Sequence, residues 1–430
     1  MTLFEELTWR QLIHQCTHEE LARELEREPL SVYCGFDPTA DSLHIGHLLA
    51  IMGLAHFQRA GHRPIALVGG ATGMIGDPSG KSEERNLLTA EAVERNTAAI
   101  GGQLGRFLDF SGENAAILVN NADWFRPITL LDFLRDIGKH FSVNAMLAKE
   151  SVRQRISNRE HGISFTEFSY QLLQAYDFLQ LYDQHGCRLQ IGGSDQWGNI
   201  VAGMDLTRRL REGANTFGLT FPLLTKSDGT KFGKTAGGAV WLSAERTSPY
   251  KFYQYWMNQA DADVPKLLRC FTFLSHEEIR GLERETEEAP HKRAGQRRLA
   301  EEVTRMAHGE AGLERAQRGS QVMFGGDLQG IDEATLLEVF EDVPSYKLPA
   351  ALLEEQPPLL DVLLHPAVDP PLFSSRGEVR RLVKNGGLYV NNQRIESETR
   401  PFSPELRTTG TTAVVRTGKK KYHLFRFGTA

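Results

Sequence analysis

Short apolar runs alternate with longer segments of helical periodicity through the first half of the sequence. The runs fall at residues 30–36, 64–70, 115–120, 188–192 and 219–224, and glycine-rich loops follow most of them. Apolar strands that alternate with helix-length segments are typical of a parallel sheet with crossover helices. Because ligands bind at the carboxyl ends of such strands, the loops after these runs are the first candidates for a functional site.

The sequence changes character near residue 248. There SPYKFYQYWMN opens with serine and proline, which is a start signal for a helix. Sequence rich in glutamate and arginine continues with helical spacing to about residue 318 and predicts a second, helical domain. Residues 344–371 then concentrate prolines around short leucine runs, which indicates a linker or a loosely packed connector.

A small basic module ends the chain. Residues 376–430 contain 12 Lys and Arg against 4 Asp and Glu, a net charge of +8, whereas the whole chain carries −6. NGGLYVNNQRI predicts a hairpin that turns at Asn391 and Asn392. A predicted helix precedes the hairpin and has four cations at helical spacing, namely Arg376, Arg380, Arg381 and Lys384.

These patterns predict an α/β protein of several domains. We expect a Rossmann-like parallel-sheet catalytic domain over residues 1–235, an α-helical domain over 236–325, a linker over 326–370 and a small α+β domain over 371–430. The hydrophobic fraction of 40% and the charged fraction of 24% exclude a disordered or fibrous chain.

The cysteines and the N-terminus indicate the compartment. The four cysteines lie far apart and form no CxxC pair, so they predict neither a zinc ribbon nor a disulfide framework. MTLFEELTWRQLIHQC carries acids where a signal peptide carries bases, and no apolar stretch approaches the ~18 residues of a membrane span. We therefore expect a cytoplasmic protein with no membrane partner.

The loop after the first strand, YCGFDPTADSLHIGHLLAIMGLAHF, carries the first chemical signal. Asp41 or Ser42 can cap a helix whose first turns contain His44, Gly46 and His47. The histidines then lie at the positive end of the helix dipole, where phosphate is favoured, and Gly46 leaves room for a base or ribose. An isolated HxxH also fits incidental histidines on an amphipathic helix or a two-histidine metal site. The position after a strand and the intact HIGH tetrad favour the phosphate site.

A second loop, GGATGMIGDPSGKSEER, follows the second strand. It is not a Walker A motif, because Ile75 stands where that motif needs glycine, and Ala71 interrupts the register of a GxGxxG. Its glycines together with Asp77, Lys81 and Arg85 favour a lid that binds anions over a plain surface loop.

The segment YQLLQAYDFLQL is apolar nearly all round. Its polar exceptions, Tyr170, Gln174 and Asp177, fall within an arc of about 60° on a helix. Such a helix is normally buried, so this trio must find partners inside the protein or in a ligand. LQIGGSDQWGN then puts Asp195 and Gln196 at the same sheet edge, where an acid suits a ribose.

The hydrophilic segment TKSDGTKFGKTAGG follows the last strand. It interleaves Lys226, Lys231 and Lys234 with glycines. A solvated surface loop is the ordinary interpretation, but its association with HIGH favours a mobile loop that closes over phosphates.

Taken in this order, the blocks resemble the class I aminoacyl-tRNA synthetases, and specifically the bacterial tyrosyl-tRNA synthetases. The resemblance covers essentially the whole chain through YCGFDPTADSLHIGH, GGATGMIGDPSGK, SYQLLQAYDF, QIGGSDQWGN, KFGKT and SPYKFYQYWMN, and the terminal module is similar to an S4 RNA-binding domain. KFGKT is similar to the class-wide KMSKS with Phe232, Gly233 and Thr235 in place of Met, Ser and Ser, and both lysines remain.

The resemblance implies an activity. The carboxylate of L-tyrosine would attack the α-phosphorus of ATP, pyrophosphate would leave, and the tyrosyl group would pass to the 3′ terminal adenosine of tRNA(Tyr). Such a protein supplies positioning and charge stabilisation but no covalent nucleophile. The resemblance further implies no tightly bound cofactor or metal, Mg²⁺ that arrives with ATP, and a homodimer whose interface lies in an insertion near residues 124–154. By the same resemblance, the helical domain binds the anticodon end of the tRNA and the basic module binds structured RNA.

The resemblance also assigns roles to residues. The catalytic positions would be Thr39, His44, His47, Lys81, Arg85, Lys231, Lys234 and Thr235. The ATP-binding positions would be Gly35, Asp37, His44, Gly46, His47, Asp195, Lys231 and Lys234, with Asp195 on the ribose. The tyrosine pocket would hold Tyr33, Asp77, Tyr170, Gln174, Asp177, Gln190 and Gln196. RNA would contact Arg376, Arg380, Arg381 and Lys384.

Three other readings compete at this point. The HxGH nucleotidylyltransferases share the sheet and a similar histidine pair, but they lack the KFGKT loop followed by a helical domain and a basic module. A tryptophanyl synthetase shares more, but Tyr33 with Asp177 suits a phenol better than an indole. A catalytically inactive RNA-binding relative is disfavoured because all the catalytic motif residues are present.

Overall fold

The computed structural model describes the chain except for residues 80–87, 158–161, 231, 236–237, 323–325, 327, 329, 419–420 and 429–430. The side chains of residues 150, 151, 154, 157, 234 and 235 also lie outside the description. Contacts within the chain divide it into two compact units, Met1–Thr247 with Trp256–Ala307, and Ser248–Tyr255 with His308–Ala430.

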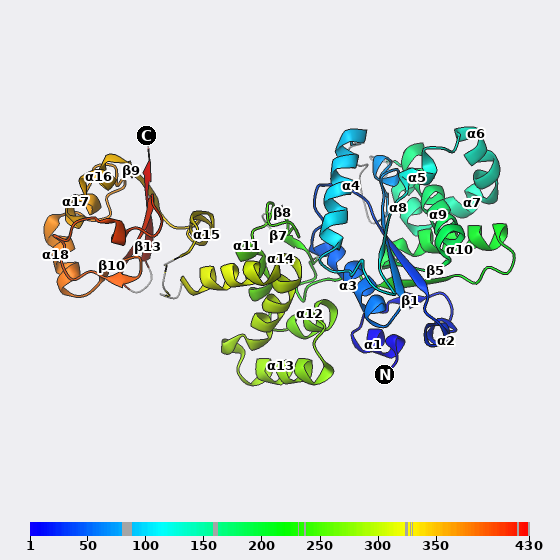
Figure 1. The fold of residues 1–430 in the computed structure, drawn as a ribbon, viewed down its shortest axis with the longest axis horizontal. Coiled ribbons are helices and arrows are strands. Elements are labelled where there is room, and N and C mark those ends of the chain that lie inside the picture. The colour runs from blue at the N-terminus through cyan, green and yellow to red at the C-terminus, as the bar shows by residue number, and fades with distance from the viewer. Residues whose placement is uncertain are drawn as a thin grey trace. The chain divides into compact units, whose positions relative to one another are not determined.

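Helices and strands alternate through the first half of the chain, as the apolar pattern predicts (Figure 1). The strands are β1 (Gln15–Cys16), β2 (Ser31–Phe36), β3 (Arg63–Val68), β4 (Ile117–Asn120), β5 (Cys187–Gly193) and β6 (Phe217–Phe221). The helices are α1 (Leu3–Trp9), α2 (Leu21–Arg27), α3 (Ile45–Arg59), α4 (Ala90–Leu104), α9 (Phe165–His185) and α10 (Trp197–Leu210). Two 3₁₀ turns, η1 (Thr72–Met74) and η4 (Ser194–Gln196), follow β3 and β5.

The six strands form one sheet in the order β1-β6-β5-β2-β3-β4. Strands β2 to β6 pair in parallel, which confirms the predicted α/β class, whereas the short β1 pairs antiparallel with β6. Figure 1 shows α3 and α4 on one side of the sheet and α9 and α10 on the other. The carboxyl ends of β2, β3, β4 and β5 therefore meet at one edge.

Aromatic and branched side chains fill the space between the sheet and helices α9 and α10. Tyr33 from β2, Ile65 from β3 and Phe178 from α9 are fully or almost fully buried there. Helix α9 buries most of its apolar positions, although Phe165 is exposed, and it also buries Tyr170 and Asp177. Two of the three polar residues that were predicted to face the interior are therefore buried, and Gln174 is half-buried. Its C-terminal cap is Gly186, in the left-handed conformation at φ 58°.

An insertion of short helical turns lies between β4 and α9. It comprises α5 (Ala122–Phe125), α6 (Leu130–Asp132), η2 (Phe133–Ile137), η3 (Gly138–His140), α7 (Val143–Leu147) and α8 (Glu150–Ser157). Several of its apolar side chains are exposed, including Leu130 at 72% and Leu131 at 78%. Among the described helices of the chain, none is long and apolar enough to cross a bilayer.

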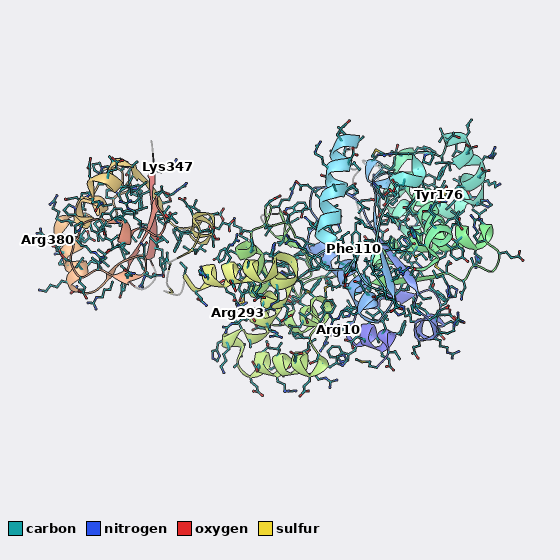
Figure 2. All side chains as sticks on the ribbon, in the orientation of Figure 1. Arg10, Phe110, Tyr176, Arg293, Lys347 and Arg380 are labelled. Atoms are coloured by element: carbon teal, nitrogen blue, oxygen red, sulfur yellow. The ribbon has the colours of Figure 1, made fainter. Side chains whose placement is uncertain are left out.

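The helical region follows a two-stranded hairpin of β7 (Lys234–Thr235) and β8 (Gly238–Ala239). Its members are α11 (Pro249–Met257), α12 (Val264–Phe271), α13 (His276–Glu288), η5 (Pro290–Lys292) and α14 (Ala294–Val322). Arg10 of α1 reaches the end of α12, where its guanidinium donates to the carbonyls of Arg269, Thr272 and Leu274 (Figure 2). Helix α14 is interrupted at Gly309, with φ 72°, so the predicted helical domain is divided between the two units.

The C-terminal domain contains a five-stranded sheet in the order β11-β10-β12-β13-β9. Its elements are α15 (Glu333–Val339), β9 (Ser345–Pro349), α16 (Ala351–Glu355), α17 (Leu359–Leu363), α18 (Arg376–Lys384), β10 (Leu388–Val390), β11 (Gln393–Arg394), η6 (Pro404–Leu406), β12 (Thr412–Thr417) and β13 (Lys421–Gly428). The predicted hairpin turn is confirmed, because Asn391 and Asn392 have φ of 51° and 59° between β10 and β11.

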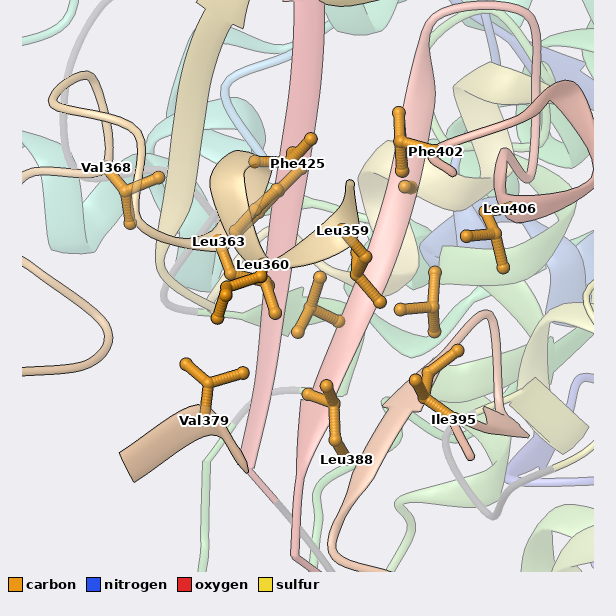
Figure 3. Close-up of a cluster of buried hydrophobic side chains, with 14 of the residues drawn as sticks. Leu359, Leu360, Leu363, Val368, Val379, Leu388, Ile395, Phe402, Leu406 and Phe425 are labelled. Atoms are coloured by element: carbon orange, nitrogen blue, oxygen red, sulfur yellow. The ribbon is translucent and has the colours of Figure 1, made fainter. Parts of the chain in front are cut away.

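The prediction of a linker over residues 326–370 is wrong for the part between β9 and α17. Strand β9 pairs with β13 and buries Tyr346 and Leu348 at alternate positions. Leu359, Leu360 and Leu363 of α17 enter the same buried cluster (Figure 3). The prolines of this stretch therefore separate short packed elements.

Candidate active site

The loops after β2, β3 and β5 bring most of the predicted site residues to one edge of the sheet. Tyr33 lies opposite Ile65 of β3 and Gln190 of β5 in the parallel register. Gly69, just after β3, leaves the space that the Asp37 carboxylate fills, since a Cβ there would lie 2.2 Å from Asp37 Oδ1. The glycine is thus needed for the close approach of two loops.

The first group of polar contacts centres on Asp37. Tyr170 Oη donates to Asp37 Oδ2 at 2.8 Å, and Thr72 Oγ1 donates to Asp37 Oδ1 at 2.8 Å. Burial raises the pKa of Tyr170 well above its usual value, and the nearby carboxylates of Asp37, Asp77 and Asp177 raise it further. Tyr170 therefore stays protonated, with a hydroxyl oxygen that can still accept a hydrogen bond.

The second group surrounds Asp177, which is buried on α9. Trp124 Nε1 donates to Asp177 Oδ1 at 2.8 Å and Asn121 Nδ2 donates to Asp177 Oδ2 at 3.1 Å. Burial raises the pKa of Asp177 to about 8, and the hydrogen bonds from Asn121 and Trp124 oppose that rise. Asn121 also donates to Thr72 Oγ1 at 2.9 Å, which joins this group to the first.

Tyr33 lies beside Asp177. Its ring packs edge-on against Phe178 at 5.2 Å between centroids. Burial raises its pKa well above the usual value, and the charge of Asp177 adds to this effect. Within the described part of the chain, the buried Tyr33 hydroxyl has no hydrogen-bond partner.

The third group joins Asp77 to α9 through Gln196. Gln196 Nε2 donates to Asp77 Oδ2 at 2.7 Å, and Gln174 Nε2 donates to Gln196 Oε1 at 3.3 Å. Asn199 Nδ2 donates to the same Gln196 oxygen at 3.2 Å. Among the described residues, the buried oxygens Gln174 Oε1 and Gln190 Oε1 accept no hydrogen bond.

The HIGH segment forms the start of α3, but the predicted caps are wrong. His44 itself is the N-cap, because its Nδ1 accepts from Gly46 N at 3.0 Å. Ser42 instead donates to Leu43 O, and Asp41 pairs with Arg246. The polar side chain nearest to the first helical amide takes the cap position.

Both histidines present their other ring nitrogen as a donor. His47 Nδ1 accepts from His44 N at 3.2 Å, just as His44 Nδ1 accepts from Gly46 N. An imidazole that accepts at Nδ1 carries its proton on Nε2 when neutral. The two rings lie 4.0 Å apart between centroids at the positive end of α3, which suits an anionic ligand.

The KFGKT segment is described only in part. Phe232 stacks on Phe271 at 5.5 Å between centroids, and Gly233 has φ 95°. Lys231, Lys81 and Arg85 lie outside the described residues, as do the side chains of Lys234 and Thr235. Four predicted ATP-site residues are exposed near the carboxyl ends of β2 and β5, namely Gly35 in β2, Thr39 in the loop after it, Gly46 in the first turn of α3 and Asp195 in η4.

Four residues that support these groups lie outside the predicted site. They are Thr72, Asn121, Trp124 and Asn199. Asn121 and Trp124 come directly after β4, so the rule that directs attention to the ends of strands could have found them.

The four cations predicted to bind RNA are exposed on α18. Two of them form ion pairs in the structure, Arg376 with Asp361 at 2.7 Å and Arg380 with Glu398 at 3.2 Å. Figure 2 shows Arg380 at the edge of the C-terminal domain. Arg381 and Lys384 complete the set on the same helix.

Comparisons with known proteins agree with this architecture. Residues 25–325 match the family described as tRNA synthetases class I (W and Y), and residues 335–425 match a tyrosine--tRNA ligase SYY-like C-terminal domain. The sequence is 54% identical over 429 residues to the tyrosine--tRNA ligase of Geobacillus stearothermophilus, covering 99% of this chain and 100% of that protein. It is 53% identical over 427 residues to the tyrosine--tRNA ligase of Roseiflexus castenholzii, covering 99% of each.

Solved structures give the same result. A C-terminally truncated mitochondrial tyrosyl-tRNA synthetase of Aspergillus nidulans has a TM-score of 0.66 at 30% identity, covering 74% of this chain and 93% of that chain. The sheet, the HIGH helix and the matched sequence blocks lie within residues 25–325. The chain therefore belongs to the class I tRNA synthetase family of the tryptophan and tyrosine enzymes.

Proposed function

We propose that this chain is a tyrosine–tRNA ligase, which forms tyrosyl-adenylate from L-tyrosine and ATP and transfers the tyrosyl group to tRNA(Tyr). Relatives that carry the name tyrosine--tRNA ligase are 54% identical over 99% of the chain. The observation that carries the proposal is a set of buried oxygens without partners in the described chain, namely Tyr33 Oη, Gln174 Oε1 and Gln190 Oε1. Such atoms are destabilising unless a ligand completes their hydrogen bonds.

Tyr33 and Asp177 suit the phenol of tyrosine. A phenol hydroxyl both donates and accepts one hydrogen bond, and it needs two polar partners at the closed end of its pocket. The Tyr33 hydroxyl can do either, and a carboxyl with a pKa of about 8 is largely protonated at neutral pH and can donate. Phenylalanine would leave these groups unpaired, so the pair selects for the hydroxyl.

The other end of the pocket suits the α-ammonium group. An ammonium group has three N–H donors and needs acceptors. Asp77 supplies a carboxylate that Gln196 holds in place at 2.7 Å, and Gln174 Oε1 supplies a buried amide oxygen. Tyr170, whose proton goes to Asp37, leaves its oxygen lone pairs available.

The adenylation chemistry needs the substrate carboxylate in line with the α-phosphorus of ATP. A carboxylate oxygen forms the new bond to phosphorus as the bond to the bridging oxygen of pyrophosphate breaks. We assign His44 to a phosphate oxygen through Nε2–H, and Thr39, Lys81, Arg85, Lys231, Lys234 and Thr235 to the remaining charge of the triphosphate. Gly35, Asp37, Gly46, His47 and Asp195 are assigned to the adenosine, with Asp195 on the ribose hydroxyls. Mg²⁺ would enter with ATP, held mainly by phosphate oxygens.

The second step and the assembly are also part of the proposal. A ribose hydroxyl of the tRNA 3′ terminal adenosine would attack the tyrosyl carbonyl, and AMP would leave. The helical region and the basic α18 face are assigned to tRNA contacts, through Arg376, Arg380, Arg381 and Lys384. We further propose that the protein acts in the cytoplasm.

We propose that a homodimer forms through the insertion near residues 124–154. The insertion supports this, because several of its large apolar side chains are exposed, among them Leu130, Leu131 and Val143, and exposed apolar side chains gathered in one segment favour an interface. Sedimentation of Leu131→Glu tests it: the variant should become monomeric, and an unchanged mass would place the interface elsewhere.

Tyrosine-dependent exchange of labelled pyrophosphate into ATP tests the function, with each of the twenty amino acids in turn. We expect exchange with tyrosine alone, and charging of tRNA(Tyr) in a second assay. Exchange with tryptophan would contradict the tyrosine assignment while keeping the family. Exchange with no amino acid would contradict the enzymatic proposal.

A further inference from the structure

The segment that leaves the KFGKT loop pairs with the segment that enters the HIGH helix. Ile45 N donates to Val240 O at 3.0 Å, and Leu242 N donates to Leu43 O at 2.8 Å. His44 and Trp241 face each other across this antiparallel bridge. The pairing joins two sequence blocks that are about two hundred residues apart, so their positions cannot vary independently.

Trp241 occupies the centre of this pairing. Its ring lies edge-on to the His44 ring at 5.8 Å between centroids. The Arg246 guanidinium carbon lies 4.6 Å from the centroid of the same ring, and Arg246 also forms an ion pair with Asp41. Trp241 thus lies between the HIGH histidine and an ion pair that spans the two segments.

The KFGKT segment reaches the same helix start from its other end. A Cβ on Gly233 would lie 3.4 Å from Ile45 Cγ1 and 3.5 Å from Gly46 N, so this loop packs on the backbone of the HIGH helix. Phe232 next to it stacks on Phe271 and lies 5.7 Å from Trp256 between centroids. The first turn of α3 is therefore contacted by the KFGKT segment at Gly233 and by the segment that follows it at Val240.

We propose that Trp241 is a positioning residue for adenylation, which holds the His44 ring in the orientation that directs Nε2–H at the phosphates of ATP. This inference rests on the proposed function. The His44 ring accepts a hydrogen bond from Gly46 N at Nδ1, and two rings flank it, that of His47 at 4.0 Å and that of Trp241 at 5.8 Å between centroids. His47 belongs to the same helix turn, whereas Trp241 fixes the His44 ring relative to the segment that leaves the KFGKT loop. The Asp41–Arg246 pair keeps the tryptophan in place.

A positioning role predicts a specific kinetic signature. Loss of the Trp241 ring should lower kcat of tyrosine-dependent pyrophosphate exchange by about 10- to 100-fold, because misplacement of a group near the reacting atoms by an ångström has effects of this size. KM for tyrosine should change by less than about 2-fold, because the tyrosine pocket lies on other elements. A purely structural role would lower the melting temperature and the amount of active enzyme instead, and kcat per active site would stay the same.

The variants separate these outcomes. Trp241→Leu should show the loss in kcat by active-site titration, and Trp241→Phe, which keeps an aromatic ring, should recover most of it. If Trp241→Leu turns over at the parent rate per active site, or if Trp241→Phe is as slow as Trp241→Leu, the inference is wrong. If the parent itself gives no tyrosine-dependent exchange, the proposed function fails first, which is a distinguishable result.

A charge-reversal cycle tests the supporting ion pair. Asp41→Arg and Arg246→Asp should each lower kcat by about 2- to 5-fold, as expected for an exposed pair, and the double variant should recover the parent rate. The matched control is Arg211→Ala, which breaks the ion pair with Asp183 away from the site and removes an arginine as exposed as Arg246. A double variant no better than the single ones would contradict the role of the pair, and slow exchange by Arg211→Ala would contradict the specificity of the effect.

Discussion

Removal of the Tyr33 hydroxyl should move stability and substrate binding in opposite directions. Tyr33 is 1% exposed, and its hydroxyl has no hydrogen-bond partner in the described chain. A buried polar group left unpaired costs about 1 to 3 kcal/mol. Tyr33→Phe keeps the ring contact with Phe178 and removes this cost, so the free protein should gain up to about that amount of stability.

The same change should weaken the binding of tyrosine. One neutral hydrogen bond contributes about 0.5 to 1.5 kcal/mol, which corresponds to a roughly 2- to 12-fold higher KM for tyrosine. Exchange with phenylalanine should rise, because this substrate no longer leaves the Tyr33 oxygen unpaired. The ratio of kcat/KM for tyrosine to that for phenylalanine should therefore fall.

Two measurements on one preparation check this reasoning. The first is the melting temperature of the free protein, and the second is pyrophosphate exchange with tyrosine and with phenylalanine. Tyr176→Phe is the matched control, because Tyr176 of α9 (labelled in Figure 2) is a half-buried tyrosine whose ring packs against Phe125 and Phe133 and is not assigned to the substrate. A lower melting temperature of Tyr33→Phe would show that the hydroxyl has a partner in the free protein, and unchanged rejection of phenylalanine would exclude Tyr33 from selection.

Three further predictions concern charge, pH and the C-terminal domain. Lys234→Ala should lower the rate of adenylate formation by about 10² to 10³ with little change in tyrosine affinity, and pre-steady-state kinetics checks this. The pKa of Asp177 is raised from 3.8 to about 8 in the folded chain, so between these pH values the folded state holds this proton and the unfolded state does not. The free energy of unfolding should therefore fall as pH rises through that range, by at most about 1.4 kcal/mol per pH unit. Asp177→Asn should remove this contribution in denaturant titrations, and identical slopes would show an ionised Asp177. Deletion of residues 345–430 should preserve pyrophosphate exchange and reduce tRNA charging, and full charging by the shortened chain would refute the RNA role of this domain. The deletion should also expose Phe340, and increased binding of a hydrophobic dye would detect that exposure.

The strands and the buried helix were predictable because their signals are local. Apolar runs marked β2 to β6 within a few residues, and the polar trio on an apolar helix marked α9. The two-residue β1 carries no such signal, because it exists only through its pairing with β6. The connector before α18 was misread because prolines occur both in linkers and at the ends of short packed elements, and only the burial of Leu359 and Leu360 distinguishes the two.

The residues that line the pocket were easier to predict than the residues that hydrogen-bond to them and hold them in place. Tyr170 and Asp177 were recognisable in the sequence because they are polar groups on a buried helix face. Trp124 does not, because an indole after a strand is compatible with simple packing, and its bond to Asp177 depends on a fold that brings β4 beside α9. The cap at His44 was missed because the preference for Asp and Ser at caps is statistical, whereas the actual helix start is fixed by its pairing with Val240.

The order of strands in the C-terminal domain also affects how the protein is made. Its first strand, β9, and its last, β13, are parallel neighbours, and β13 lies between β9 and β12. Because synthesis runs from the N-terminus, β9 must wait until β13 has been made before it can pair. The sheet of this domain can therefore close only after residues 421–428 leave the ribosome, whereas the parallel sheet of the first unit can form earlier. A premature stop within β13 would separate β9 from the other strands and leave β9 and one edge of β12 unpaired. The truncated product would then combine a folded first unit with exposed strand edges, which are prone to aggregation.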